Sequence, residues 1–427
     1  MLPLNRTGKL ARDRSFALFL ANFMVGKGLA FFGPIALGLL LVPEVYGQLE
    51  FALAGAQMAA LAATLGVPSA AMQLVLMRIG RSVTDLLAGV ATIIGILSVA
   101  AAILLPVAGI APRFALLAAF SCLCAMQQSG VAYARAHNSR NFNVWIDHAP
   151  TISAVALAAG LTLFHVGVDV AHMTCATATL GALAVVATGL IAWKNRAGDF
   201  VARLFEASAI GLPMVAASVV GAWMISSGRV YAGTLLTEND VYAYAFVFRV
   251  ASVLVLLHAV VITAFAAQLY KMPTRRFDPI AAVLIAVVAC GALALIVVQP
   301  ERFAAAWVAA TKAQLLAERP ALSLVPLQIF FWIAGALVEG RVSRARRAGR
   351  GAVLNASVAL VGAVTIAGVY TSGTMRFRTL MIVLTGQQAM ACVVLHWVLW
   401  RSRLPLSRTV ITTAIAGAAL TIFALVR

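Results

Sequence analysis

The chain has 427 residues, of which 63% are hydrophobic and only 11% are charged, whereas charged residues make up roughly a quarter of a soluble domain. This composition excludes a soluble globular protein and predicts an integral membrane protein that functions within its helices or short loops. The net charge of +18 would suggest a nucleic-acid partner in a soluble protein, but the basic residues follow membrane topology, so we expect no nucleic-acid binding.

Apolar windows recur along the whole chain, and a spanning helix needs about 20 mostly apolar residues. The first window is too long for a signal-peptide core and contains a lysine, so no cleavable signal peptide is expected. Thirteen spans are predicted, at 15–41, 45–77, 82–108, 112–134, 144–165, 169–193, 205–231, 239–270, 279–299, 320–340, 351–371, 377–400 and 409–426. The mixed segment 301–319 is expected to lie at the outer surface as an interfacial helix.

Most of the 32 basic residues fall at alternate ends of these spans, in the loops that are cytoplasmic if the N-terminus is inside. Because cytoplasmic loops are enriched in Lys and Arg, this distribution predicts a multi-pass protein with a cytoplasmic N-terminus. The most basic loop, GRVSRARRAGRG at 340–351, is read as a topological anchor rather than as a binding motif.

Two similar stretches indicate an internal repeat. PEVYGQLEFA at 43–52 begins the second span, and NDVYAYAFVF at 239–248 begins the eighth, with Tyr46 and Tyr242 in matching places. Six helices separate the copies, so both halves enter the membrane in the same sense, as in many alternating-access transporters. We therefore predict an all-α polytopic protein with two six-helix lobes, 1–200 and 201–403, around a central cavity, plus an extra C-terminal helix at 404–427.

Two cations lie inside predicted spans, where an ionisable group costs about 2.5 to 3.5 kcal/mol on insertion scales. Lys27 lies roughly 18 Å into a core of about 30 Å, and Arg249 lies roughly 12 Å below the outer surface. If both faced the cavity, they would suit a pyrophosphate. Alternatively, Lys27 pairs with Glu50 on the next helix. Arg229, near the outer end of the seventh span, either extends the cationic path or snorkels to the interface.

Four carboxylates also fall in or near spans: Glu50, Asp147, Glu206 and Glu339. Protonation or a sodium ion at one of them would couple to transport, and Glu50 is the best candidate because the others lie nearer to helix ends. The six histidines and five cysteines have no metal-ligand spacing. No metal or other cofactor is therefore expected.

The first span carries small and helix-breaking residues around its lysine. Gly26 and Gly28 flank Lys27, and Gly33 and Pro34 follow within two turns. Proline removes a backbone hydrogen bond and glycine permits bending, so these residues are hinge candidates. Close helix packing is the competing interpretation.

A family resemblance rests on the stretches around the repeat. The run VPEVYGQLEFALAGAQMAALAATLGVPSAAMQLVLMR, from Val42 to Arg78, resembles the start of Wzx-like polysaccharide flippases of the multidrug/oligosaccharidyl-lipid/polysaccharide exporter superfamily. SSGRVYAG and VYAYAFVFRVASVLVLL, within 226–271, are similar to the family's seventh and eighth helices. The chain departs from the family in two ways. Relatives commonly have twelve or fourteen helices, and they often have an acidic residue where this chain has Gly228.

The resemblance implies a bacterial inner-membrane flippase rather than an enzyme. Its expected substrate is an oligosaccharide on an undecaprenyl pyrophosphate carrier, moved from the cytoplasmic to the periplasmic leaflet for polysaccharide export. Expected partners are this lipid-linked oligosaccharide, membrane lipids, H⁺ or Na⁺ as a coupling ion, and other polysaccharide assembly proteins. Two alternatives remain: a multidrug or cation antiporter of the same superfamily, and a membrane enzyme of polysaccharide assembly.

Overall fold

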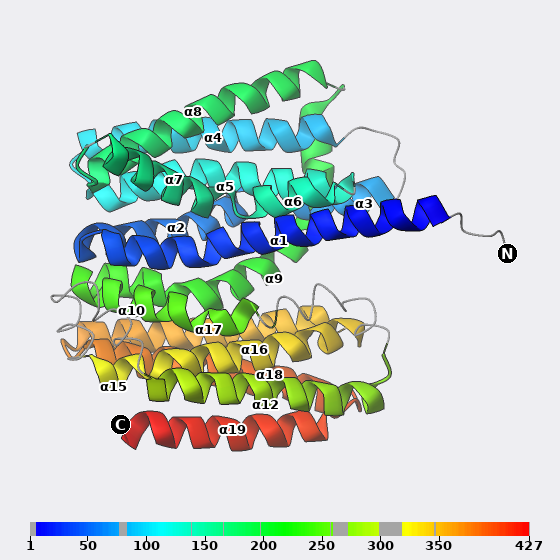
Figure 1. Cartoon of the computed structure of the whole chain (residues 1–427), viewed down its shortest axis with the longest axis vertical. Coiled ribbons are helices and arrows are strands. Elements are labelled where there is room, and N and C mark those ends of the chain that lie inside the picture. Colours follow the sequence, from blue (N-terminus) through cyan, green and yellow to red (C-terminus); the bar gives the residue numbers. More distant parts are fainter. Residues whose placement is uncertain are drawn as a thin grey trace. The chain divides into compact units, whose positions relative to one another are not determined.

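The computed structural model describes residues 6–76, 83–137, 139–164, 166–196, 198–256, 258, 272–298, 318–345 and 347–426. The secondary structure of these ranges is helical (Figure 1). Ten of the described helices are long and apolar enough to cross a membrane, or eleven if one bent pair counts as a single span. The predicted all-α polytopic fold class is therefore confirmed.

The observed helix bounds agree best with the spans predicted at 82–108, 112–134, 169–193 and 377–400. The first half of the chain contains α1 (Arg6–Leu40), α2 (Pro43–Ala63), α3 (Val67–Leu76), α4 (Thr84–Val107), α5 (Pro112–Ala136), α6 (Arg140–Asp147), α7 (Ala149–Leu163) and α8 (Val170–Lys194). The second contains α9 (Phe200–Leu235), α10 (Glu238–Ala251), α12 (Thr274–Val298), α15 (Arg319–Leu322), α16 (Leu324–Arg344), α17 (Ala348–Thr371), α18 (Phe377–Arg401) and α19 (Ser407–Val426).

The chain forms two compact units, and the first comprises Met1–Leu37 and Gly55–Ala216. Within its described residues, α4, α5 and α8 pack against one another (Figure 1). A core of Leu86, Leu87 and Val90 from α4 meets Val67 and Ala207 from neighbouring helices. This burial of apolar faces holds α3 and α4 against the start of α9.

The second unit comprises Gly38–Ala54 and Ala217–Arg427. The boundary between the two units therefore falls within α9, and the start of α2 belongs to the second unit. In this unit α16 packs on α18, and α12 packs on α16 and α19 (Figure 1). The expected C-terminal helix is present as α19, and Asp278 of α12 caps it, accepting the N–H groups of Arg408 (3.0 Å) and Thr409 (2.9 Å).

The span expected at 45–77 is wrong as a single helix, because the chain turns between α2 and α3. Leu65 and Gly66 have positive φ values of 50° and 80°. The backbone of Gly66 lies so close to that of Gly211 that neither position has room for a Cβ atom. Glycine tolerates this conformation and this approach, which a hydropathy pattern does not register.

The span expected at 144–165 is likewise two helices, since α6 and α7 meet at a 62° bend beside His148. In contrast, α1 runs unbroken through Gly26, Gly28, Gly33 and Pro34. Residues 301–317 of the predicted interfacial helix at 301–319 lie outside the described residues.

Candidate functional site

A buried cluster in the second unit joins Glu50 of α2 to two arginines; we call Glu50, Arg229 and Arg249 the Glu50 cluster. Arg249 donates from Nε to Oε1 of Glu50 (2.8 Å) and from Nη2 to Oε2 (2.9 Å). Arg229 of α9 donates from Nη1 to Oε2 (2.8 Å). Three residues that the sequence presented separately therefore form one contact group.

Among the described residues, the Glu50 cluster carries a net positive charge. Two guanidinium groups, which stay protonated in proteins, share one carboxylate, so the cluster has a net charge of +1. The side chain of Glu50 is 1% exposed, that of Arg229 is 6% exposed and that of Arg249 is 17% exposed. Arg229 Nε is buried and has no hydrogen-bond partner among the described residues. Arg249 is thus the group of the cluster that a ligand reaches most readily.

The two copies of the sequence repeat build the frame of this cluster. The rings of Tyr46 and Tyr242 pack edge to face, with centroids 5.4 Å apart. Tyr242 donates its hydroxyl to the Gly38 carbonyl (2.7 Å), and Tyr46 donates to Glu50 Oε1 (3.3 Å). The matching tyrosines, found by sequence alone, therefore pack directly together and position Glu50.

Local packing explains why residue 228 is a glycine. The Wzx-like family that the sequence resembles often has an acidic residue at this position. A Cβ atom at this position would collide with the hydroxyl of Tyr244, which itself donates to Gln328 Oε1 (3.2 Å). The next residue, Arg229, lies over the ring of Phe248, with Cζ 5.1 Å from the centroid. Arg229 is buried in this packing, so the snorkelling interpretation of Arg229 does not describe its position.

Lys27 belongs to a second, looser cluster in the first unit. Its Nζ atom lies 3.5 Å from Asp147 Oδ2, and the two side chains are 25% and 34% exposed. His148 Nε2 lies 3.6 Å from the same oxygen, and Gln127 donates to the Asp147 carbonyl (2.5 Å). The carboxylate beside Lys27 is therefore Asp147, at the α6–α7 bend, rather than Glu50.

The hinge candidates differ in their surroundings within the first unit. A Cβ atom on Gly26 would lie 2.8 Å from Val144, and one on Gly33 would lie 2.6 Å from Val155. Gly28, by contrast, has nothing within 4 Å of that position. Gly26 and Gly33 thus allow close packing on α6 and α7, and Gly28 is the member of the set that packing does not explain.

Sequence reasoning missed one buried ion pair. Arg203 of α9 donates to Asp85 of α4 through Nη1 (2.7 Å) and Nη2 (3.1 Å), and both side chains are buried. The signal was available, because Asp85 is an acidic residue at the start of an apolar span. Among the described residues, no group of three or more His, Cys, Asp or Glu side chains has a geometry that could hold a metal.

Comparison with solved structures identifies the fold. The crystal structure of the eukaryotic MATE transporter AtDTX14 aligns with a TM-score of 0.50 and 15% identity, over 95% of this chain and 94% of that chain. The chain has the fold of a MATE transporter. A MOP superfamily transporter from Pyrococcus furiosus, described as having a binding pocket of reverse polarity, aligns with a TM-score of 0.46 and 15% identity, over 90% and 94% of the two chains.

A MATE protein in the bent conformation aligns with a TM-score of 0.44 and 16% identity, over 92% and 94% of the two chains. No protein-family model and no curated protein sequence matches this chain. The MATE-like fold does not distinguish flippases from multidrug transporters.

Proposed function

We propose that the protein is a flippase that moves an anionic lipid-linked oligosaccharide from the cytoplasmic to the periplasmic leaflet by alternating access. The observation that carries the proposal is the net positive charge of the Glu50 cluster, buried in a membrane-spanning unit. An uncompensated cation in a low-dielectric region attracts an anion strongly, and arginine matches phosphate oxygens through its planar fork.

A multidrug or cation antiporter would use the same fold, so the choice rests on charge. At the Glu50 cluster a cationic substrate would find no free carboxylate, because both oxygens of Glu50 already accept hydrogen bonds from arginines. The Glu50 cluster would repel such a substrate. The undecaprenyl pyrophosphate carrier implied by the sequence resemblance fits the cluster better.

The two charge clusters have different roles in this proposal. Arg249 is the partly exposed member of the Glu50 cluster and contacts the pyrophosphate, while Glu50 holds Arg249 and Arg229 in place. Protonation of Glu50 would raise the cluster's charge from +1 to +2, which disfavours Glu50 as the coupling group. In the first unit, Asp147 offsets the charge of Lys27, so this pair presents no net charge to an anion.

The test is translocation of undecaprenyl-pyrophosphate-linked oligosaccharide in proteoliposomes, read by enzymatic access to the glycan at the outer leaflet. Arg249→Met leaves Glu50 paired with Arg229, so the site becomes neutral without stranding a carboxylate. We expect this variant to lose at least about tenfold in rate, since one charge-assisted contact is worth roughly 1.5 to 3 kcal/mol. Arg249→Lys keeps the charge but not the fork and should be intermediate.

The matched control is Arg401→Met, which removes a basic residue at the end of α18, away from the Glu50 cluster in sequence and outside it. The proposal fails if the wild type moves no lipid-linked oligosaccharide. The role of Arg249 fails if Arg249→Met, present at normal levels, transports as well as Arg401→Met. Translocation of an organic cation by the wild type would favour the antiporter.

A further inference from the structure

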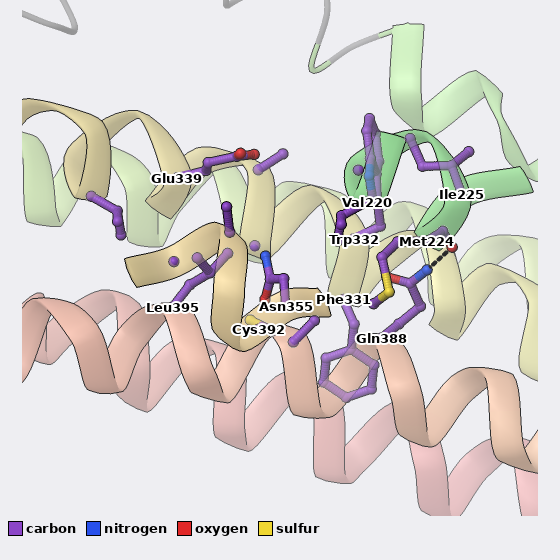
Figure 2. A pocket seen from close by; sticks show the side chains of 17 residues that line it. Val220, Met224, Ile225, Phe331, Trp332, Glu339, Asn355, Gln388, Cys392 and Leu395 are labelled. Atoms are coloured by element: carbon purple, nitrogen blue, oxygen red, sulfur yellow. Dashed lines mark hydrogen bonds between the residues drawn. The ribbon is translucent and has the colours of Figure 1, made fainter. Parts of the chain in front are cut away.

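A partly open cavity of about 280 Å³ in the second unit is lined by residues of α9, α16, α17 and α18 (Figure 2). The cavity and the Glu50 cluster share no residue, because none of the cluster's three residues lines the cavity. Most of its wall is apolar, with Trp332 and Phe331 as its aromatic residues. A few polar groups on an apolar wall are typical of small-molecule sites.

Three polar side chains from three helices line this cavity: Glu339 of α16, Asn355 of α17 and Gln388 of α18 (Figure 2). Gln388 donates its amide to the Met224 carbonyl, so its orientation is fixed. Asn355 Oδ1 is buried without a hydrogen-bond partner among the described residues. A buried acceptor without a donor costs free energy, and a ligand that supplies an N–H or O–H group would remove that cost.

The chemistry of the wall favours a neutral ligand with several hydroxyl groups. Carboxylate and amide side chains bind neighbouring hydroxyls, and the faces of aromatic rings pack on the C–H groups of a pyranose. The inner polar groups, Asn355 and Gln388, are uncharged. Glu339 is an exposed residue, so its carboxylate is not a buried charge that requires a cation. No basic residue lines the cavity.

We propose that this cavity binds one sugar unit of the transported oligosaccharide, with Asn355 and Glu339 as hydroxyl-binding residues and Trp332 as the packing surface. The inference rests on the proposed function and adds a glycan subsite to it. The volume lies just below the range of about 300 to 1,000 Å³ found for small-molecule sites, which suits a monosaccharide-sized group and excludes a whole oligosaccharide.

The test is saturation-transfer NMR on the purified full chain in nanodiscs, with a panel of free glucose, galactose and N-acetylglucosamine, and with tetramethylammonium as the cationic probe. Asn355→Leu and Glu339→Gln should each weaken binding of the preferred sugar at least about fivefold, the loss expected for one hydrogen bond. Val353→Leu, at an exposed position of α17, is the matched control and should bind normally.

Thermal unfolding of each variant identifies loss of fold, and Glu339→Gln, which keeps the side chain's size, serves if Asn355→Leu is unstable. The inference is overturned if no sugar of the panel binds, if the two variants bind as well as Val353→Leu, or if tetramethylammonium binds in place of sugars. Such a result with normal translocation by the wild type leaves the flippase proposal intact. Sugar binding without translocation supports the cavity and refutes the flippase.

Discussion

At the residue scale, the Glu50 cluster illustrates why a buried charge is rarely alone. Each arginine would be costly in hydrocarbon by itself, and the shared carboxylate removes much of that cost. The environment of Lys27 differs from that of the arginines, because its side chain is partly exposed and its Nζ atom lies 3.5 Å from Asp147 Oδ2. The tight cluster thus has its geometry set by the protein, whereas the loose pair retains freedom to exchange partners.

This arrangement predicts an unequal response of stability to substitution. Glu50→Gln leaves two buried arginines without a counter-charge, and breaking a buried pair costs on the order of 3 to 5 kcal/mol. We expect a large fall in the unfolding temperature of the detergent-solubilised protein. Arg249→Met leaves a neutral pair and an apolar replacement, so its fall should be much smaller. Equal unfolding temperatures for the two variants would contradict a shared-carboxylate cluster.

At the element scale, the helices that differ from expectation do so at backbone features. Hydropathy placed 45–77 and 144–165 in the membrane, but it could not locate the turn at Gly66 or the bend beside His148. The turn at Gly66 comes with a close approach to the distant Gly211, whereas the bend beside His148 lies next to Pro150 in the first turn of α7. Membrane helices tolerate such breaks where neighbouring groups satisfy the backbone.

Substitutions at two glycines of α1 distinguish a role in bending from a role in helix packing. Gly28→Ala meets no neighbour and should raise helix stability by roughly 0.5 to 1 kcal/mol. If α1 bends at this residue during transport, translocation in proteoliposomes should fall several-fold while the unfolding temperature holds or rises. Gly26→Ala should instead lower the unfolding temperature, because its methyl group meets Val144. Unchanged translocation by Gly28→Ala would assign this glycine no hinge role.

At the scale of the whole molecule, the sequence predicted the fold class and many helix bounds, and it singled out Glu50, Arg229 and Arg249 separately, but it did not predict that they pair with one another. A membrane span can be predicted from local composition, because each stretch of about 20 residues shows its own hydropathy. Pairing depends on which helix faces meet, and Glu50 is far in sequence from Arg229 and Arg249. The tyrosine repeat was the one sequence signal that connected these regions, since Tyr46 and Tyr242 pack together.

The topology of the whole chain gives the last prediction. If the thirteen predicted spans and the cytoplasmic N-terminus are correct, the end of α18, with Arg401 and Arg403, lies in the cytoplasm and the end of α19 lies on the opposite side of the membrane. Alkaline phosphatase, which is active only outside the cytoplasm, should therefore be inactive when fused after residue 404 and active when fused after residue 427. A fluorescent protein that folds only in the cytoplasm should give the opposite pattern at the same two sites. Matching signals at both sites would mean that α19 does not cross the membrane, and reversed signals would overturn the orientation drawn from the basic loops.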